Sequence, residues 1–204
     1  MLKDAGNVES IVLAAGYSSR AGAFKPLMDL SGRTVLERCL SGMADTCSRM
    51  IVVGGYCMER LEPIVKMYPN AELIENPDYP KGMFTSIQSG ARAATGERVF
   101  ITPGDIPLIK KETYLALLQA EGEIILPVYK GMTGHPVLLS RRMIEALLEE
   151  PETSCLRDFI QKHETTLVKV DDAGILMDLD TPEDYERILG VLNRRGGNAR
   201  ETRD

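Results

Sequence analysis

Short apolar runs alternate along the chain with longer stretches that mix apolar and polar residues. The first runs are almost uniformly apolar, which is typical of strands in a parallel sheet that is covered on both faces. The pattern predicts strands at Val8–Leu13, Met50–Val53, Glu72–Ile74, Arg98–Thr102, Ile124–Pro127, Pro136–Leu139 and Thr166–Val170.

The longer stretches between these runs have the spacing of amphipathic helices. They predict helices at Thr34–Met43, Met58–Met67, Thr85–Ala94, Lys111–Ala120, Arg141–Glu149, Leu156–Lys162 and Pro182–Arg194. Alternating strands and helices indicate an α/β fold, with a mostly parallel, doubly wound sheet and right-handed crossovers. We therefore expect a single three-layer α/β/α domain over residues 1–193. The charged, glycine-containing segment 194–204 is expected to be a frayed or disordered tail.

Composition narrows the possible partners. The chain has 204 residues, a net charge of −6 and no basic run, which argues against nucleic-acid binding. No apolar stretch is long enough for a membrane span, and the polar start lacks a signal-peptide core, so we expect a cytoplasmic protein. The four cysteines form no CxxC pair and the chain has only two histidines, which argues against zinc.

The segment from Ile11 to Lys25 carries the strongest chemical signal. An apolar run stops at small residues, and the loop that follows contains Gly16, Gly22, Arg20 and Lys25. A buried strand that ends in a glycine-containing loop brings backbone N–H groups close to a ligand, and Arg and Lys add positive charge. This combination predicts a site for a triphosphate.

The spacing of the loop excludes two familiar phosphate-binding motifs. A P-loop requires Gly, four residues and then Gly-Lys-Ser/Thr, but here five residues stand between Gly16 and Gly22, and Ala23 follows in place of Lys. The dinucleotide fingerprint requires Gly-x-Gly-x-x-Gly, but Ser18 and Ala21 occupy the positions of its second and third glycines.

What the loop does contain is L-A-A-G-x-S-x-R-x-G-x-x-K, which resembles the signature of the MobA-like NTP transferase family, in particular the molybdopterin cytidylyl- and guanylyltransferases. The resemblance implies a nucleotide-diphospho-sugar transferase-like Rossmann fold. It also implies that the loop binds the nucleotide, with Arg20 and Lys25 stabilising its phosphates. The nucleotide-binding residues implied in this loop are Leu13, Ala14, Ala15, Gly16, Ser18, Arg20, Gly22 and Lys25.

Two acidic elements complete the predicted phosphate site. Asp105 follows a predicted strand in Thr102-Pro103-Gly104-Asp105-Ile106-Pro107, where a turn carboxylate suits a hard cation bound mainly by phosphate and water. The family resemblance makes Asp105 catalytic and a metal ligand, and adds Pro103 and Gly104 to the nucleotide site. It makes Asp180 the second ligand of Mg²⁺ or Mn²⁺, with Asp178 a weaker candidate. Thr181 is predicted to cap the following helix.

Two further elements match the same family. Asn76, Gly82 and Ser86 match its N-x-x-x-x-x-G-M-x-x-S motif and are expected to contact the nucleotide; Thr85 and Ser86 would expose hydroxyls at a helix N-terminus. Gly134-His135-Pro136-Val137 is typical of the cytidylyltransferase branch, so Gly134 and His135 are assigned to the acceptor. We expect each motif to follow a strand, at the carboxyl edge of the sheet.

Together these motifs imply an enzyme that transfers a nucleoside monophosphate to a molybdopterin-like phosphomonoester and releases pyrophosphate. Ala15 stands where guanylyl-transferring relatives have glycine, and its methyl group narrows the pocket against a purine, which favours CTP over GTP. A molybdenum hydroxylase would be the client. A guanylyltransferase, a sugar-phosphate nucleotidyltransferase and a non-catalytic delivery protein for the cofactor remain alternatives.

Overall fold

Eight strands form one central sheet in the computed structural model, which describes residues 7–17 and 23–201, with side chains as far as residue 194. Their order across the sheet is β3-β2-β1-β4-β7-β5-β6, and β8 lies beside β5. The strands are β1 (Val8–Leu13), β2 (Arg49–Gly54), β3 (Ala71–Glu75), β4 (Arg98–Pro103), β5 (Ile124–Tyr129), β6 (Met132–Thr133), β7 (Val137–Ser140) and β8 (Thr166–Lys169).

The sheet has a parallel half and a half with mixed strand directions. β3, β2, β1 and β4 are all parallel, with Leu13 beside Val53 and Pro103 at the carboxyl ends of three of them. β7 runs antiparallel to both β4 and β5, whereas β8 is parallel to β5. The expected mostly parallel sheet is confirmed, and the direction of β7 is the feature that the apolar pattern could not provide.

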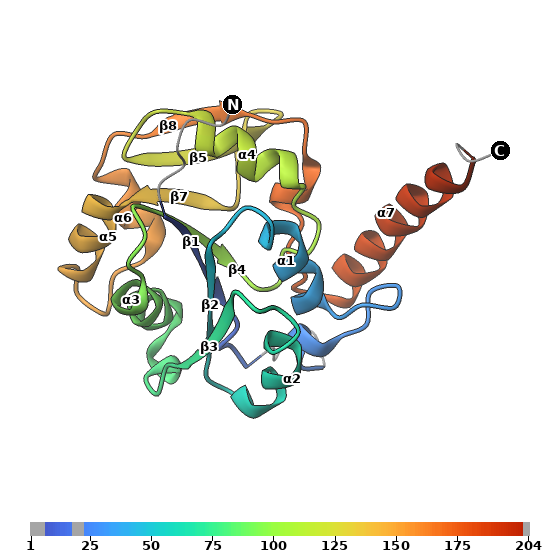
Figure 1. The fold of residues 1–204 in the computed structure, drawn as a ribbon, viewed down its shortest axis with the longest axis horizontal. Coiled ribbons are helices and arrows are strands. Elements are labelled where there is room, and N and C mark those ends of the chain that lie inside the picture. Colours follow the sequence, from blue (N-terminus) through green and yellow to red (C-terminus); the bar gives the residue numbers. More distant parts are fainter. Residues whose placement is uncertain (1–6, 18–22, 202–204) are drawn as a thin grey trace.

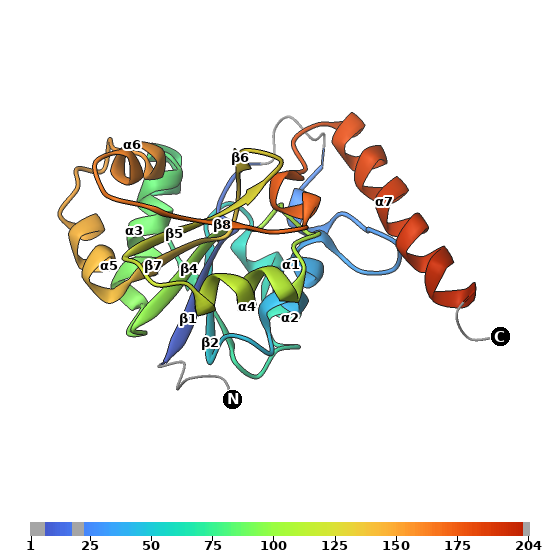
Figure 2. The ribbon, with the colours of Figure 1, turned by 90° about the horizontal axis from the view of Figure 1, so that it is seen from above.

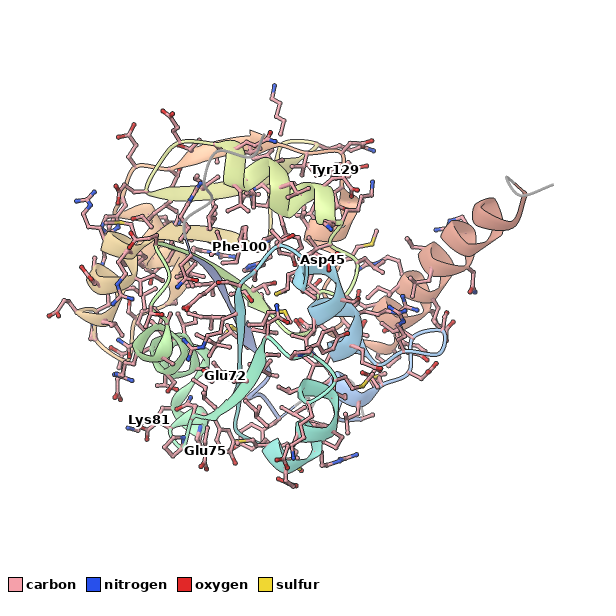
Figure 3. All side chains as sticks on the ribbon, in the orientation of Figure 1. Asp45, Glu72, Glu75, Lys81, Phe100 and Tyr129 are labelled. Atoms are coloured by element: carbon pink, nitrogen blue, oxygen red, sulfur yellow. The ribbon has the colours of Figure 1, made fainter. Side chains whose placement is uncertain are left out.

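Helices cover both faces of this sheet, as the three-layer prediction requires (Figures 1 and 2). The apolar residues of α1, α2 and α4 form one core with alternate strand residues such as Val12, and those of α3, α5 and α6 form another with Ile11 and Leu13. The helices are α1 (Val35–Met43), α2 (Glu62–Val65), α3 (Met83–Ala93), α4 (Lys111–Gln119), α5 (Arg141–Leu148), α6 (Leu156–Gln161) and α7 (Pro182–Glu201). Figure 3 shows Phe100 inside the molecule and Glu75 and Lys81 at its edge.

Most predicted elements lie within a few residues of their observed bounds, with two exceptions. The helix predicted over Met58–Met67 is instead a 3-10 turn (η2, Met58–Arg60) followed by the short α2, because Pro63 is tolerated only in the first turn of a helix. The short strand β6 was not predicted, since its two residues are too few to show a period.

The last helix differs from its prediction at its end. α7 begins at Pro182 as expected, and Thr181 and Asp184 cap it reciprocally: Asp184 N donates to Thr181 Oγ1, and Thr181 N donates to Asp184 Oδ2. The helix continues to Glu201 and projects away from the sheet (Figures 1 and 2). The helix therefore runs past its predicted end at Arg194, and the charged, frayed tail expected over residues 194–204 stays a prediction.

Candidate active site

A cavity of about 360 Å³ lies at the carboxyl end of β1, and we call it cavity 1. It brings together most of the predicted nucleotide and metal residues: Leu13, Ala14, Ala15, Gly16, Lys25, Gly82, Ser86, Pro103, Gly104, Asp105 and Asp180. Ser18, Arg20 and Gly22, which were also predicted to bind nucleotide, lie outside the described residues. The carboxyl edge of the parallel strands is where ligands bind in folds of this type.

Hydrogen bonds to neighbouring strands fix the loop that forms the floor of cavity 1. Ala14 N donates to Val53 O of β2 at 2.9 Å, and Tyr56 N donates to Ala15 O at 3.2 Å. On the other side, Gly104 N donates to Leu13 O at 2.8 Å. The loop is therefore positioned by the ends of both strands that flank β1.

One end of cavity 1 is charged. The Lys25 ammonium lies 3.1 Å from Asp105 Oδ2 and 2.6 Å from Asp180 Oδ1, and the Lys25 side chain is only 12% exposed. Lys25 begins a 3-10 turn (η1, Lys25–Leu27), Asp105 follows β4 and Asp180 precedes α7. Three segments far apart in the sequence thus place one cation between two carboxylates.

The electrostatics of this group follow from partial burial and mutual attraction. Burial opposes the charge on Lys25, but hydrogen bonds and attraction to Asp180 and Asp105 outweigh it and raise the pKa of the ammonium. Burial also raises the pKa of Asp105, against the effect of Lys25, and the neighbouring carboxylates Asp180 and Asp178 add to the rise. Lys25 therefore partly offsets the cost of burying the Asp105 carboxylate beside other carboxylates.

Backbone contacts set the distance between the two aspartates. Leu179 N donates to Asp105 O at 3.0 Å, which ties the segment before α7 to the end of β4. Asp180 N donates to Asp184 Oδ2 at 3.2 Å, and this bond fixes the backbone of Asp180 against the start of α7. The positions of the two aspartates are thus fixed by backbone hydrogen bonds as well as by the ion pairs with Lys25.

The aspartate pair fits a hard divalent cation. Both carboxylates already converge on the Lys25 ammonium, which occupies the place of a cation between them. Their donor atoms are oxygens, the type that Mg²⁺ and Mn²⁺ prefer, and such ions commonly take only one or two carboxylates from the protein. The described residues contain no group of three or more metal-ligating side chains, so the remaining ligands would come from phosphate oxygens and water.

Two further cavities adjoin cavity 1, and Met83 and Pro103 line all three. Cavity 2, of about 830 Å³, lies beneath α6 and has an apolar wall that includes Phe84, Ile87 and Leu156. Cavity 3, of about 300 Å³, shares Asp105 and Asp180 with cavity 1, and it shares Gly134 and His135 with cavity 2.

His135 reaches this edge differently from the other motifs. It precedes β7 instead of ending a parallel strand, because β7 runs antiparallel to β4. The Gly134-His135 motif does follow a strand, the short β6, but β6 and β7 are both antiparallel to their neighbours and are not among the parallel strands that end at this edge. Gly134 allows the close approach, since a Cβ atom there would lie 2.3 Å from Ile175 O, and His135 N donates to the same oxygen at 3.1 Å.

The imidazole of His135 is half-buried and only partly satisfied. Its Nδ1 atom is buried and has no hydrogen-bond partner among the described residues. Burial lowers the pKa of His135, against a backbone hydrogen bond with Ile101 and attraction to Asp178. The ring is therefore neutral at pH 7, and the residue lines cavities 2 and 3 although its Nδ1 atom is buried.

Asn76 and Thr85 do not lie where direct contact with a nucleotide requires. Asn76 is 1% exposed, is absent from the walls of cavity 1, and donates from Nδ2 to Thr85 Oγ1 and Ser86 Oγ, each at 2.9 Å. Thr85 is buried too and donates to Gly82 O at 2.8 Å. Asn76 therefore braces the first turn of α3, and Ser86, itself largely buried, lines the cavity.

Sequence reasoning missed several residues at this site. Tyr17 and Tyr79 line cavity 1, and Met83 lies where all three cavities meet, 62% exposed. Outside the three cavities, sequence reasoning also assigned no role to Asp172, which is buried and accepts from Lys110 N at 2.7 Å, from Thr113 Oγ1 at 2.8 Å and from Gly174 N at 2.9 Å. An aspartate close behind an apolar strand was the available signal for Asp172.

Known sequences similar to this chain are nucleotidyltransferases. A model of the MobA-like NTP transferase domain matches residues 10–167. The molybdenum cofactor cytidylyltransferase of Escherichia coli (strain K12) is 30% identical over 179 residues, which cover 87% of this chain and 93% of that protein. A probable molybdenum cofactor guanylyltransferase of Carboxydothermus hydrogenoformans is 23% identical over 202 residues, covering 92% and 98%.

Solved structures share the fold over almost the whole chain. A nucleotidyl transferase from Methanothermobacter thermautotroptrophicus superimposes with a TM-score of 0.80 at 20% identity, covering 92% of this chain and 98% of its own. Rv0371C of Mycobacterium tuberculosis H37Rv, crystallised in complex with manganese, has a TM-score of 0.74 at 20% identity, covering 90% and 98%. Within the described part of the chain, no helix is both long and apolar enough to cross a membrane.

Proposed function

The chain belongs to the MobA-like NTP transferase family, and from this premise we propose that it transfers CMP from CTP to the phosphate of a molybdopterin-like acceptor. An acceptor oxygen attacks the α-phosphorus of the nucleotide. The bond from the α-phosphorus to the oxygen that bridges to the β-phosphate breaks, and pyrophosphate leaves. The family and its nucleotidyltransferase activity are shown by the sequence matches; the nucleotide and the acceptor are the proposal.

The observation that carries the proposal is the position of Asp105 and Asp180, which line both cavity 1 and cavity 3. A triphosphate in cavity 1 and an acceptor phosphate in cavity 3 would meet at these two carboxylates. The body of the acceptor would lie in the larger, mostly apolar cavity 2, whose wall includes Gly134 and His135. Such positioning accounts for much of the rate gain in phosphoryl-type transfer.

The chemistry needs no general base. A phosphomonoester has a second pKa of about 6 and is therefore already ionised near pH 7. Lys25 is positioned to neutralise charge on the donor phosphates once it leaves the aspartate pair. Asp105 and Asp180 would hold Mg²⁺ or Mn²⁺, which on binding supplies Lewis-acid stabilisation of the phosphate oxygens. The manganese complex of the Mycobacterium tuberculosis relative supports a divalent ion at such a site.

Two observations favour CTP. Ala15 is 5% exposed and lines cavity 1, so its methyl group takes space that a larger base would use. The cytidylyltransferase of Escherichia coli matches 87% of this chain at 30% identity, whereas a probable guanylyltransferase of Bacillus cereus (strain AH187) with a similar identity of 31% matches only 71% of it. Each methyl-sized difference in an apolar pocket changes selectivity about tenfold or more.

The test is pyrophosphate release from the purified protein mixed with Mg²⁺, molybdopterin and either CTP or GTP. We expect release with CTP and little with GTP. Faster release with GTP would replace the proposal with guanylyl transfer. If the protein binds CTP but releases no pyrophosphate with either molybdopterin or sugar phosphates as acceptors, it would be a non-catalytic carrier. A molybdenum hydroxylase as the client stays a prediction, to be tested by transfer of the product to such an enzyme.

A further inference from the structure

Cavity 1 has two chemically different ends, and the order of the strands fixes their places. β4 lies on one side of β1 and contributes Asp105, so the charged end lies there. β2 and β3 lie on the other side, and the segment after β3 contributes Tyr79, Pro80 and Gly82 to the wall. A nucleotide whose phosphates reach Lys25 must therefore direct its base toward the β2 and β3 side.

Aromatic rings cluster at that second end. The ring centroid of Tyr17 lies 5.3 Å from that of Tyr56 and 5.3 Å from that of Tyr79. The neighbouring Tyr17 side chain raises the pKa of Tyr79. Tyr17 is 51% exposed although it packs in this cluster. Large aromatic side chains that stay exposed at the mouth of a cavity are suited to stacking on a flat ligand.

The backbone beneath Tyr79 accommodates its ring closely. A Cβ atom on Gly55 would lie 2.7 Å from Tyr79 Cγ and 2.8 Å from Tyr79 Cβ, so only glycine fits there. Asn76 N donates to Gly54 O at 2.9 Å and Tyr79 N donates to Asn76 O at 3.3 Å. The end of β2 and the segment after β3 therefore hold Tyr79 in one place before any ligand arrives.

We propose that Tyr79, supported by Tyr17 and Gly55, binds the nucleobase of the nucleoside triphosphate by stacking. This proposal rests on the function proposed above and adds the base-binding residues to it. The ring supplies affinity for any base, because every base has a π-face. Selection between cytosine and guanine stays with the space beside Ala15, on the floor of the same cavity.

A tryptophan substitution gives a direct test, since the chain contains no tryptophan. In Tyr79→Trp, we expect CTP to quench the emission of the single indole at saturation. Inorganic tripolyphosphate, which lacks a base, is expected to displace CTP in equilibrium dialysis and to leave the emission unchanged. Unchanged emission at CTP concentrations where dialysis shows saturation would overturn the proposal.

Alanine and phenylalanine variants measure the size of the effect. Tyr79→Ala is expected to weaken CTP binding about 5- to 150-fold, the range for loss of one base–aromatic stack, with tripolyphosphate binding unchanged. Tyr79→Phe should stay within about threefold of the wild type, because the ring is kept. Equal losses for CTP and tripolyphosphate in Tyr79→Ala would mean that Tyr79 only supports the loop, which also overturns the proposal.

Tyr56→Ala is the matched control, since Tyr56 belongs to the same cluster but is absent from the wall of cavity 1. A loss of CTP affinity equal to that of Tyr79→Ala would show that packing of the cluster, not contact with the base, is responsible. The failure of the proposed function looks different: the wild type would bind CTP and quench as expected, yet release no pyrophosphate with any acceptor.

Discussion

The parallel half of the sheet and the half with mixed strand directions place their candidate functional residues at the same edge in different ways. In β1, β3 and β4, the residues that follow each strand form cavity 1. In β7, which is antiparallel, the residues that precede the strand, Gly134 and His135, reach cavities 2 and 3. In our proposal, the parallel half forms the nucleotide side and the other half contributes the acceptor side.

The difference explains why this edge can hold two ligands. Parallel neighbours all direct their carboxyl ends to one edge, which gathers loops suited to one extended ligand. Reversing β7 brings a segment of different origin against the end of β4, and the segment before α7 adds Asp178 and Asp180. The two aspartates that line both cavity 1 and cavity 3 lie where the halves meet, so changes there are expected to have the largest effects.

Asp105→Asn should give the largest loss, because it removes one carboxylate from the point that both sides share. We expect pyrophosphate release to fall about 1000-fold, and Mn²⁺ binding, followed by electron paramagnetic resonance, to weaken in parallel. The shape of the side chain is kept, so the melting temperature should change by only a few degrees. Asp45→Asn, at the exposed ion pair with Lys111, is the control and should leave the rate unchanged. Full activity in Asp105→Asn would show that the Asp105 carboxylate is not needed for the reaction.

Lys25→Ala tests the charged end of cavity 1 alone. The rate should fall about 100-fold because the donor phosphates lose a neutralising charge. Metal binding should respond in the opposite direction. Without nucleotide, the ammonium competes with a divalent ion for Asp105 and Asp180, so Lys25→Ala should bind Mn²⁺ about tenfold more tightly than the wild type.

The control for Lys25→Ala is Lys66→Ala, which removes an exposed lysine paired with Glu62 on the surface. It should change neither rate nor Mn²⁺ affinity. Weaker Mn²⁺ binding in Lys25→Ala would show that the lysine helps to form the metal site and does not compete for it. An unfolded Lys25→Ala protein would assign Lys25 to the core instead of to the reaction.

The two halves also differed in how far the sequence alone could predict them. The bounds of β1 match their prediction because an apolar run that ends in small residues is a local signal. The direction of β7 depends on which strands pair, and this is a non-local property that periodicity does not contain. The split at α2 could have been predicted from Pro63, whose effect on a helix is local.

Site residues follow the same division. Asp105, Asp180 and Lys25 were expected together, and the structure brings their charged groups within 3.1 Å or less. Asn76 shares the same motif as Ser86, yet only the fold shows that its side chain is buried behind the cavity wall. Tyr79 was visible in the same segment, but nothing in the sequence shows that Gly55 makes room for its ring.

Ala15→Gly tests the base side of the comparison. Removing the methyl group enlarges cavity 1, so we expect the ratio of GTP affinity to CTP affinity to rise about tenfold, with the rate on CTP changed only a few-fold. Dialysis with both nucleotides measures the ratio. Ala23→Gly, at an exposed position outside the cavity, is the control. An unchanged ratio would mean that base selection lies elsewhere than beside Ala15.

The smallest predicted effect concerns the mixed half and the stability of the protein. Burial lowers the pKa of His135 in the folded state below the value of about 6.5 expected when unfolded. The unfolded chain therefore binds a proton on this residue, as the pH falls below about 6.5, before the folded protein does. The free energy of unfolding should consequently decrease as the pH is lowered, by at most about 1.4 kcal/mol per pH unit from this group. Well above a pH of about 6.5 the ring is neutral in both states and contributes no slope.

His135→Asn isolates that contribution, because asparagine keeps a polar side chain and does not titrate. Urea unfolding at pH 8.5, 7.5, 6 and 5 should show that the wild type loses more stability than His135→Asn between pH 6 and pH 5, and that the two differ little in slope between pH 8.5 and pH 7.5. Parallel curves throughout would mean that a cation can be accommodated on this side of the site. The mixed half would then differ from the nucleotide side in its strand directions, and both sides would accommodate a charged group.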